Sequence, residues 1–488
     1  MIGKLKNFLF GEESLKQTLA KNSFWFGVSN IGSQLIRLIV VIYAARLLGA
    51  AQYGLFSYAL TIAAMFTILS DFGLNYLFSI SLARRDENEE AYFPTLVILR
   101  GGLIAAIIVL TIIIGPMLTK FPEAKILIPL VALLVAADDI RGFLIGFVRA
   151  ENRIDKEALG TIITNALIVL LSLIALGYAP TPYALTAAYL IGSALGTCMM
   201  FFMVRKGIKK VLRRWMFSIL SAKKILAVAV PFGLANTIWI LMTSTDALVI
   251  GWFRTASELG QYAAAQRPIS ALTLVPTIMA ASSLTLIARA AKEGAQERLK
   301  SFIERLVTLS LAIVFPIAVG GIIVAPGIIH LLYGPEYLPA ILSFQLLCIT
   351  LAINYPASVI TNLVLAFKQQ KIFTAAMVIG ALGNLLLDIL LVPRFGIAGS
   401  VIATICALGI INGYIWYSAR KLTPFKVAPF LPRIIFATVC MGIGTFVLQL
   451  ISINLFINIA ISAVVYLGVL IVLREPLLRD VKGLFRFQ

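Results

Sequence analysis

The sequence predicts an all-α polytopic membrane protein with about 14 transmembrane helices, arranged as two pseudo-symmetric six-helix lobes plus two C-terminal helices. Hydrophobic residues make up 60% of the 488-residue chain and charged residues 13%. Soluble proteins have a balance of roughly half apolar and a quarter charged residues. Apolar stretches long enough to cross a bilayer recur along the whole chain, and basic residues collect in alternate connections between them.

The chain begins with a lysine-bearing amphipathic segment, 1–22, which predicts a helix lying at the membrane interface. The apolar stretch that follows is longer than the core of a cleavable signal peptide and is typical of a membrane anchor. A span needs about 20 apolar residues, and the connections between the candidates are short. The predicted spans are 23–48, 53–82, 93–119, 126–149, 158–177, 183–204, 225–252, 259–287, 303–332, 338–366, 372–392, 397–418, 431–450 and 454–473.

Lysine and arginine test this map, because they collect in the cytoplasmic loops of membrane proteins. With both termini inside, and with residues within three positions of a span end counted with the adjoining loop, 32 of the 41 basic residues fall in inner segments and five in outer loops. The remaining four lie deeper within spans: Arg37, Arg100, Arg141 and Arg267. One span more or fewer would reverse every later loop and spoil this asymmetry. The pattern therefore predicts a multi-pass protein of the cytoplasmic (inner) membrane with cytoplasmic termini.

An internal duplication organises the spans. AAQYGLFSYAL between spans one and two matches SELGQYAAAQ between spans seven and eight, which places Gly54 opposite Gly260. An even number of spans per unit makes the two units parallel in the membrane. The predicted organisation is an interfacial segment, 1–22; an N-terminal lobe, 23–206; a basic cytoplasmic linker, 207–224; a C-terminal lobe, 225–420; and spans thirteen and fourteen with a cytoplasmic tail, 421–488.

Several functional classes find no support in the sequence. The net charge of +19 is spread over inner loops beside apolar spans, which argues against nucleic-acid binding. The densest basic run suits a helix on anionic headgroups, with a specific partner site as the alternative. Four isolated cysteines and a single histidine predict no metal site, and no nucleotide-binding or catalytic motif is present. We therefore expect no cofactor, no catalytic residue and no enzymatic activity.

Four stretches resemble a known family: SFWFGVSNIGSQLIRLIVVIYAARLLGAAQYGLFSYA, TDALVIGWFRTASELGQYAAAQRP, LLYGPEYLPA and NLLLDILLVPRFGIAGSVIAT. In this order and spacing they resemble the polysaccharide flippases of the multidrug/oligosaccharidyl-lipid/polysaccharide exporter superfamily, over spans one to twelve. The resemblance implies two lobes around a central cavity that opens alternately to each side. It also implies outward transport of a polyprenyl-diphosphate-linked glycan for cell-surface polysaccharide biosynthesis, next to other polysaccharide-assembly membrane proteins. The two C-terminal helices look like those of the lipid II flippase branch, where they help line a groove for the lipid tail.

Arginines in the spans suit such a substrate, because a guanidinium binds phosphate bidentately and stays charged. Arg37 in span one and Arg267 in span eight have a similar depth in the outer half of the membrane and come from different lobes. They are the predicted diphosphate contacts, with Arg100 as a third. The alternative is a structural salt bridge for Arg37 and Arg267, with Asp246 or Asp388.

Span four, LIPLVALLVAADDIRGFLIGFVRA, carries an unusual group of charges. Asp138 and Arg141 are neighbours at i, i+3 of a helix, and we predict a structural charge pair. Asp139 lies about 100° around the helix and is the candidate proton or cation site, together with Asp71. The alternative for Asp139 is a bond to Arg100 or to a neighbouring backbone group.

The spans contain four arginines and five aspartates, although a cavity dedicated to a diphosphate should be net positive. This keeps a second hypothesis open, a cation-coupled exporter of multidrugs or other organic molecules from the same superfamily. A membrane-embedded glycan polymerase is the third, and it lacks any constellation of nucleophile, base or metal ligands. The predicted partners are the lipid-linked glycan and membrane lipids.

Overall fold

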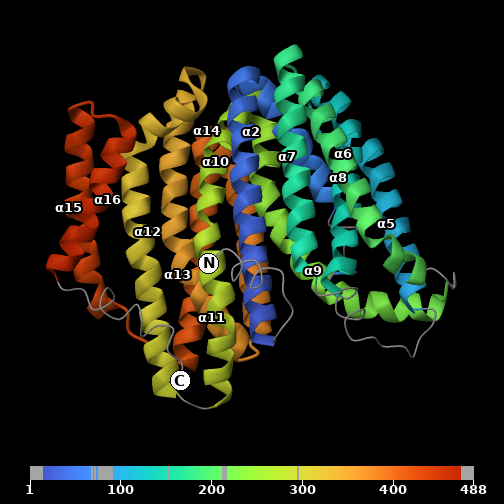
Figure 1. Cartoon of the computed structure of the whole chain (residues 1–488). Coiled ribbons are helices and arrows are strands. Elements are labelled where there is room, and N and C mark those ends of the chain that lie inside the picture. The colour runs from blue at the N-terminus through green and yellow to red at the C-terminus, as the bar shows by residue number, and fades with distance from the viewer. Residues whose placement is uncertain are drawn as a thin grey trace, which may run out of the picture. The chain divides into compact units, whose positions relative to one another are not determined.

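The computed structural model describes residues 15–67, 70, 73–74, 92–150, 153–211, 217–293 and 296–473. Every element in these ranges is a helix, which confirms the predicted all-α class (Figure 1). The chain divides into two compact units, Met1–Ser244 and Thr245–Gln488, which we call unit 1 and unit 2. Each is described by itself below.

Unit 1 is built from helices. They are α2 (Leu15–Phe66), α5 (Tyr92–Ile114), the short 3₁₀ helix η1 (Gly115–Leu118), α6 (Pro122–Ala150), α7 (Ile154–Tyr178), α8 (Pro182–Val211) and most of α9 (Ile219–Phe253). Helix α2 packs on α6 and α7, and α8 packs on α6 and α7 as well. The helices of this unit therefore share one interior.

Helix α2 is interrupted at Gly49. The backbone there has φ 73° and ψ 169°, a conformation that glycine adopts without steric cost. Gly49 directly follows the predicted first span, so α2 contains all of predicted span one and the beginning of span two. The predicted second span extends past Phe66, where α2 ends, into residues that are outside the described ranges.

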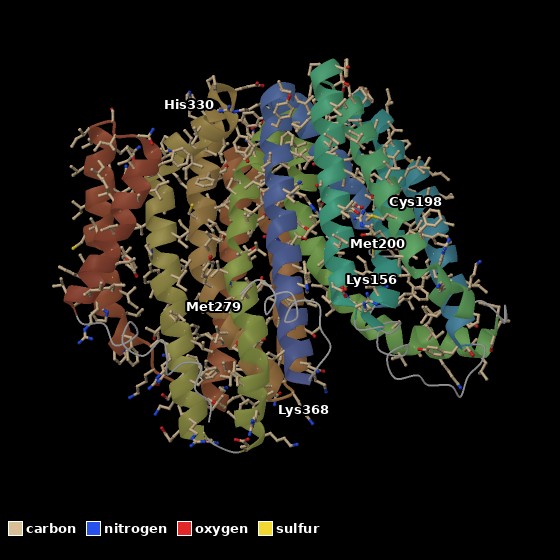
Figure 2. All side chains as sticks on the ribbon, in the orientation of Figure 1. Lys156, Cys198, Met200, Met279, His330 and Lys368 are labelled. Atoms are coloured by element: carbon tan, nitrogen blue, oxygen red, sulfur yellow. The ribbon has the colours of Figure 1, made fainter. Side chains whose placement is uncertain are left out.

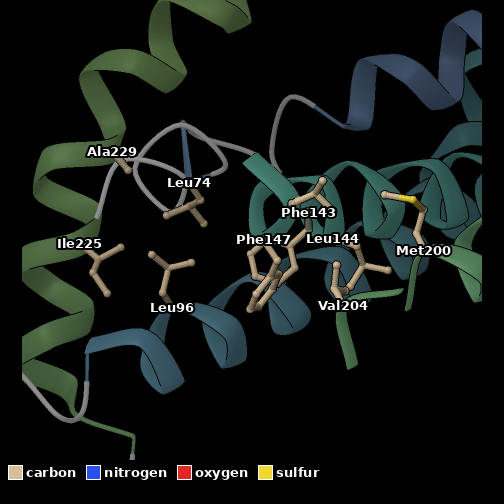
Figure 3. Packing of buried hydrophobic residues seen from close by; sticks show 10 residues of the cluster. Leu74, Leu96, Phe143, Leu144, Phe147, Met200, Val204, Ile225 and Ala229 are labelled. Atoms are coloured by element: carbon tan, nitrogen blue, oxygen red, sulfur yellow. The ribbon is translucent and has the colours of Figure 1, made fainter. Parts of the chain in front are cut away.

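A cluster of apolar side chains joins α5, α6, α8 and α9 in unit 1 (Figure 3). Its members are Leu74, Leu96, Phe143, Leu144, Phe147, Val148, Met200, Val204, Ile225 and Ala229. The rings of Phe143 and Phe147 meet edge to face, with centroids 5.8 Å apart. Because Ile225 and Ala229 belong to α9, the first half of α9 packs in unit 1, while its last residues belong to unit 2.

Unit 2 is also built from helices. Its elements are α10 (Ala256–Leu272), α11 (Leu274–Lys292), α12 (Gln296–Tyr333), η2 (Pro335–Ala340), α13 (Ile341–Ala366), α14 (Gln370–Leu422), η3 (Ala428–Phe430), α15 (Leu431–Leu450) and α16 (Leu455–Val472). Lys368, just after α13, and His330, near the end of α12, lie at opposite ends of this unit (Figure 2). Helix α13 therefore crosses the unit from end to end.

Helix α14 contains two helical segments that fold back on each other at Gly396, where φ is 60°. A Cβ atom added at Gly380 would meet Ile411, and one added at Gly399 would lie 2.5 Å from the Leu391 carbonyl oxygen. Residues before and after Gly396 thus face each other at nearly equal sequence distances, which is the pattern of an antiparallel hairpin. The predicted spans eleven and twelve are the two arms of this hairpin.

The helices α15 and α16 form a second hairpin, which packs on α12. Buried polar groups join its arms: Thr445 Oγ1 donates to Ser462 Oγ at 2.7 Å, and Asn458 Nδ2 donates to the Thr445 carbonyl oxygen at 3.1 Å. Tyr466 donates from its hydroxyl to the Ala312 carbonyl oxygen of α12 at 2.6 Å. Such bonds are worth roughly 0.6 kcal/mol each in a membrane and fix which faces meet.

Ten helical stretches in the described part of the chain are long and apolar enough to cross a membrane. Two of them, Gly32–Phe66 and Gln370–Leu422, contain the interruptions at Gly49 and Gly396. Helix α6 is long enough but is not among the ten, because charged residues interrupt its apolar run. The protein is a multi-pass membrane protein, and the count of fourteen spans stays a prediction.

Candidate functional site

Arg37 lies on α2 in unit 1, beside α7. Its Nε donates a 2.8 Å hydrogen bond to Oδ1 of Asn165. Asn165 is buried, and its Nδ2 donates to the Thr161 carbonyl oxygen at 2.8 Å. Arg37 itself is exposed. A charged side chain within a span must face water, a polar ligand or polar protein groups rather than lipid, so Arg37 borders a polar region.

Arg267 lies on α10 in unit 2 and is also exposed. The predicted span eight is two helices, because α10 ends at Leu272 and α11 begins at Leu274. Pro268 follows Arg267 directly and lies within α10. Thr273, between the two helices, keeps helical backbone angles, and its N–H donates to the Ile269 carbonyl oxygen at 3.3 Å. Arg267 is thus placed next to a proline, between one and two turns before the junction of α10 and α11.

Arg100 and Asp139 form a buried ion pair between α5 and α6. Arg100 Nη2 lies 2.6 Å from Asp139 Oδ1, and Arg100 Nη1 donates to the Ser70 carbonyl oxygen. The Arg100 guanidinium therefore lies inside unit 1, and its predicted substrate contact would require a change of conformation. For Asp139 this is the contact that the sequence offered as the alternative to an ion site. Asp71, the other predicted ion site, lies outside the described residues.

A small apolar cavity lies next to this ion pair, between α2, α5 and α6. Among the residues that line it, only Asp139 is charged, and the others are Ala63, Thr67, Ile104, Ile107, Ile108, Thr111, Ala132, Val135 and Ala136. The cavity is enclosed mostly by methyl groups, which favour neither an ion nor a phosphate. It can accommodate small adjustments of Asp139 but is not shaped for a glycan.

Asp138 and Arg141 contact each other on α6, as i, i+3 spacing predicts. Arg141 Nη2 lies 2.6 Å from Asp138 Oδ1, and Arg141 Nη1 donates to Ser193 Oγ of α8 at 3.0 Å. Ser193 in turn donates to Asp138 Oδ1 at 2.5 Å. The pair therefore also links α6 to α8, which suits the predicted structural role.

Two buried aspartates in unit 2 share one asparagine. Asn384 Nδ2 donates to Asp246 Oδ1 and to Asp388 Oδ2, each at 2.8 Å. All three side chains are at most 4% exposed. Asp246 lies on α9, and the other two lie four residues apart on the first arm of the α14 hairpin. We call these three residues the acid cluster.

Hydroxyl groups complete the surroundings of the acid cluster. Asp246 Oδ2 accepts hydrogen bonds from the hydroxyls of Tyr262 at 2.5 Å and Thr404 at 2.9 Å. Ser400, one turn before Thr404, is also buried. Its Oγ and Oδ1 of Asp388 have no hydrogen-bond partner within the part of the chain that the structure describes. These two oxygen atoms of the cluster could therefore accept a hydrogen bond from, or coordinate, an added cation or proton donor.

The chemistry of the acid cluster favours one added positive charge. Two negative carboxylates close together in a buried place repel each other, and a proton or a cation between them removes the repulsion. Carboxylate, amide and hydroxyl oxygens are ligands for hard cations. No group of three or more His, Cys, Asp or Glu that could hold a metal ion occurs in the described ranges. A proton or a monovalent cation fits this arrangement.

A clasp around Arg254 holds together the elements that carry the acid cluster. Arg254 Nε donates to the Val392 carbonyl oxygen at 3.0 Å, and Nη2 donates to the Pro393 carbonyl oxygen at 3.2 Å. Glu258 lies 3.8 Å from Arg254 Nε. The Arg254 clasp thereby ties the corner between α9 and α10 to the turn of the α14 hairpin, about two helical turns from Asp246.

The acid cluster was missed as a site in the sequence, where Asp246 and Asp388 entered only as partners for arginines. One pattern points to it: Asn384 and Asp388 at i, i+4, then Ser400 and Thr404 at i, i+4, in two otherwise apolar arms. Polar residues at this spacing share one helix face. The third residue, Asp246 on α9, comes 138 residues before Asn384. Nothing in the sequence around Asp246 indicates that it packs against these two arms.

Comparisons with known proteins match most of the chain. A sequence profile of the family described as "Polysaccharide biosynthesis protein" matches residues 19–285. The probable low-salt glycan biosynthesis flippase Agl15 of Haloferax volcanii is 24% identical over 461 residues, which cover 92% of this chain and 94% of that protein. The lipopolysaccharide biosynthesis protein WzxC of Escherichia coli is 25% identical over 373 residues, which cover 74% of this chain and 72% of that protein.

Solved structures share the fold. The lipid II flippase MurJ in an inward closed conformation aligns with a TM-score of 0.76 and 20% identity, over 93% of this chain and 99% of that one. A multidrug resistance MATE family transporter in an inward-facing conformation aligns with a TM-score of 0.66 and 18% identity, over 80% of this chain and 94% of that one. At these identities the likeness concerns the fold.

Proposed function

This chain belongs to the polysaccharide biosynthesis protein family, and on that premise we propose that it is a flippase for a polyprenyl-diphosphate-linked oligosaccharide. It carries the repeat unit from the cytoplasmic to the outer leaflet by alternating access, for the assembly of a cell-surface polysaccharide. Its partners are the lipid-linked glycan, the surrounding lipids and other membrane proteins of polysaccharide assembly. The membrane is the cytoplasmic one, and both termini are inside.

The observation that carries this proposal is the exposed Arg37 within the long, mostly apolar helix α2. A lipid-linked glycan brings a diphosphate into the membrane, and a guanidinium is its best-matched protein partner. Arg267 supplies a second exposed guanidinium, in unit 2. The names of the relatives, a glycan biosynthesis flippase and a lipopolysaccharide biosynthesis protein, support this substrate class. They argue for a transporter rather than an enzyme such as a polymerase.

We assign energy coupling to the acid cluster. Binding of a proton or a monovalent cation between Asp246 and Asp388 would favour the arrangement in which both remain buried. Release of that charge would favour another arrangement and so drive the transport cycle. The predicted coupling roles of Asp139 and Asp71 remain predictions. For Asp139 the bond to Arg100 already balances the charge.

The lipids that accompany the purified protein test the proposed substrate. The full chain is extracted in a mild detergent and its bound lipids are weighed by native mass spectrometry. We expect polyprenyl-diphosphate sugars with the wild type and a strong reduction with Arg37→Ala. The matched control is Arg254→Ala, which removes an arginine of the clasp and leaves Arg37 untouched. Equal lipid content in wild type and Arg37→Ala would contradict the proposal.

A cation-coupled exporter of organic molecules is the second candidate, and the acid cluster is the observation that favours it. The fold is shared with multidrug transporters, and buried carboxylates suit cationic drugs as well as coupling ions. In that case no glycolipid accompanies the protein. Instead, an organic cation should bind in competition with the coupling ion, and Asp246→Asn should abolish this binding.

A further inference from the structure

Three cations lie where the second arm of the α14 hairpin continues into the connection to α15. They are Arg420, Lys421 and Lys426, which are all exposed, and we call them the basic patch. We propose that the basic patch binds the headgroup of an anionic phospholipid of the cytoplasmic leaflet. Such a lipid is a bound neighbour of the protein and is separate from the transported glycolipid of the proposed function.

Carboxylates do not balance the charge of the basic patch. The sequence has no acidic residue between Asp388 and Glu475. In the part of the chain that the structure describes, no carboxylate forms an ion pair with any of the three cations. Glu304 of α12 comes near, but its Oε1 accepts a 2.7 Å hydrogen bond from the backbone N–H of Lys426 and not from the ammonium group. The basic patch therefore attracts anions.

Aromatic rings hold two of the cations in place. Lys421 Nζ lies 4.3 Å from the ring centroid of Tyr417, and the central guanidinium carbon of Arg420 lies 5.9 Å from that of Phe425. Phe425 is buried, and its ring meets the Trp416 ring edge to face. A ring attracts a cation without neutralising it, so both groups keep their charge for an anion.

The connection after α14 fixes the third cation. Its backbone is extended at Thr423, and the side chains of Phe425 and Val427 are buried. Alternate side chains of an extended segment point to opposite sides, so Lys426, between them, is exposed. The hydrogen bond from its backbone to Glu304 also ties the connection to α12. All three cations thus lie on backbone that packing holds in place.

One face of α14 leads from apolar side chains to the basic patch. Ile410, Tyr414 and Tyr417 are 51%, 42% and 59% exposed, and with Lys421 they recur at intervals of four, three and four residues. Residues at this spacing lie on one side of a helix. Aliphatic side chains suit acyl chains, tyrosines collect at headgroup level, and lysines extend to the headgroups. This order matches a phospholipid from its tails to its phosphate, whereas a free phosphate or an acidic peptide would need only the cations.

The basic patch lies at the end of unit 2 that carries Lys368 (Figure 2). A Cβ atom added at Gly380 in the first arm of the hairpin would meet Ile411 in the second. The start of the first arm, with the exposed Lys371, is therefore level with Arg420. The predicted topology puts this end on the cytoplasmic side, where anionic lipids attract basic residues next to the membrane.

Native mass spectrometry of the purified full chain tests the site with two lipids. Dioleoyl phosphatidylglycerol is anionic, and dioleoyl phosphatidylcholine has no net charge. The patch variant combines Arg420→Gln, Lys421→Gln and Lys426→Gln. Its affinity for phosphatidylglycerol should fall at least about tenfold, because each basic residue near the headgroup contributes to the attraction. Its affinity for phosphatidylcholine should not change. A second variant with Arg420→Lys, Lys421→Arg and Lys426→Arg keeps the charge and should bind phosphatidylglycerol as the wild type does.

The matched control combines Arg153→Gln, Arg289→Gln and Lys300→Gln. These three residues are also predicted to be cytoplasmic, but each has a carboxylate partner: Asp155, Glu293 and Glu297. The control removes as much positive charge as the patch variant does. A general attraction by the cytoplasmic side would therefore be weakened equally in both, whereas we expect the control to keep the wild-type affinity for phosphatidylglycerol.

Wild-type binding of phosphatidylglycerol by the patch variant would overturn this site, and so would an equal loss in the patch variant and the control. Displacement of phosphatidylglycerol by an excess of inorganic phosphate would overturn it as well, because the patch would then bind free anions. Polyprenyl-diphosphate sugars should accompany the patch variant as they do the wild type, and their loss together with phosphatidylglycerol would assign the patch to transport instead. If no such sugar accompanies the wild type, the proposed function fails, while selective phosphatidylglycerol binding would still support the lipid site.

Discussion

Asp246 and Asp388 accept hydrogen bonds from the same amide nitrogen, Nδ2 of Asn384, each over 2.8 Å. One neutral group thus holds two acids of different helices at a fixed separation, away from solvent. The amide has no charge to give, so a proton or cation entering the cluster would balance its excess negative charge. This relationship leads to a prediction for Asp388.

Asp388→Asn should abolish the ion dependence of stability. We expect wild-type melting temperatures to rise in sodium chloride, relative to choline chloride at equal ionic strength, or at about pH 5.5 relative to pH 8. A bound ion at a hundred times its dissociation constant raises the free energy of unfolding by about 2.7 kcal/mol, which is large enough to be seen as a rise in melting temperature. Asp388→Asn removes one charge and should melt at the same temperature in all four conditions. Asp138→Asn is the control, and its melting temperature should depend on sodium and pH as that of the wild type does. If Asp388→Asn keeps this dependence, the acid cluster is excluded as the coupling site.

Arg37→Ala and Arg267→Ala should each leave expression near normal and abolish export in a complementation assay. Insertion depends on the apolar pattern of the spans, whereas transport of a diphosphate depends on the charge. Lysine should rescue only partly, because it lacks the bidentate fork, and glutamine should fail. The double variant should be no worse than either single one if both arginines serve one binding event. Export at half the normal level or better in well-expressed Arg37→Ala would refute this assignment.

The contact between Asp138 and Arg141 predicts a stability effect. Arg141→Ala should destabilise by roughly 1 kcal/mol, because Asp138 loses its cation but is partly exposed to solvent. Replacing both residues by alanine should recover part of the loss, since no unpaired charge remains. Thermal melting of the detergent-solubilised protein measures both changes. If the double variant is as unstable as Arg141→Ala, the pairing is not what stabilises α6.

The topology predicts which positions a membrane-impermeant thiol reagent reaches in intact cells. In a variant without the four native cysteines, single cysteines at Ala51, Pro180 and Glu336 should react from outside. Glu336 is a better position for the cysteine than nearby Gly334, because Gly334 has a φ of 89°, which favours glycine. Cysteines at Gly207 and Lys421 should react only after the membrane is opened. Reaction of Gly207→Cys in intact cells would overturn the fourteen-span map.

Contacts that depend on helical spacing could be predicted from the sequence, and those that depend on packing could not. The contact between Asp138 and Arg141 follows from their i, i+3 positions. The bond between Arg100 and Asp139 is one of the alternatives that the sequence offers for Asp139. The acid cluster needs α9 beside the α14 hairpin, and nothing near Asp246 in the sequence indicates that neighbour. Helix α9 also contains residues of both units, because the boundary follows Ser244. The basic segment before α9 does not predict that one helix belongs to both.

The predicted linker and lobe boundaries illustrate the same limit. A change from basic to apolar composition near residue 224 reveals where a span begins, but not which partners it packs against. In the structure, Ile225 and Ala229 of α9 pack in unit 1, although the sequence places them in the second lobe. Side chains on opposite halves of one helix can thus belong to different cores, and composition alone does not distinguish them.

The sharing of Asn384 by two helices has a consequence for how the protein is made. Asp246 is synthesised 138 residues before Asn384, which at about 5–20 residues per second is a delay of roughly 7 to 28 seconds. A lone aspartate in a membrane helix is costly to insert, up to about 2.5–3.5 kcal/mol at the helix centre. Tyr262 follows Asp246 by only 16 residues and donates a hydrogen bond to it. It therefore shortens the time during which Asp246 has no partner. Nascent chains that end before the α14 hairpin should therefore depend on the insertion machinery to retain α9 in the bilayer.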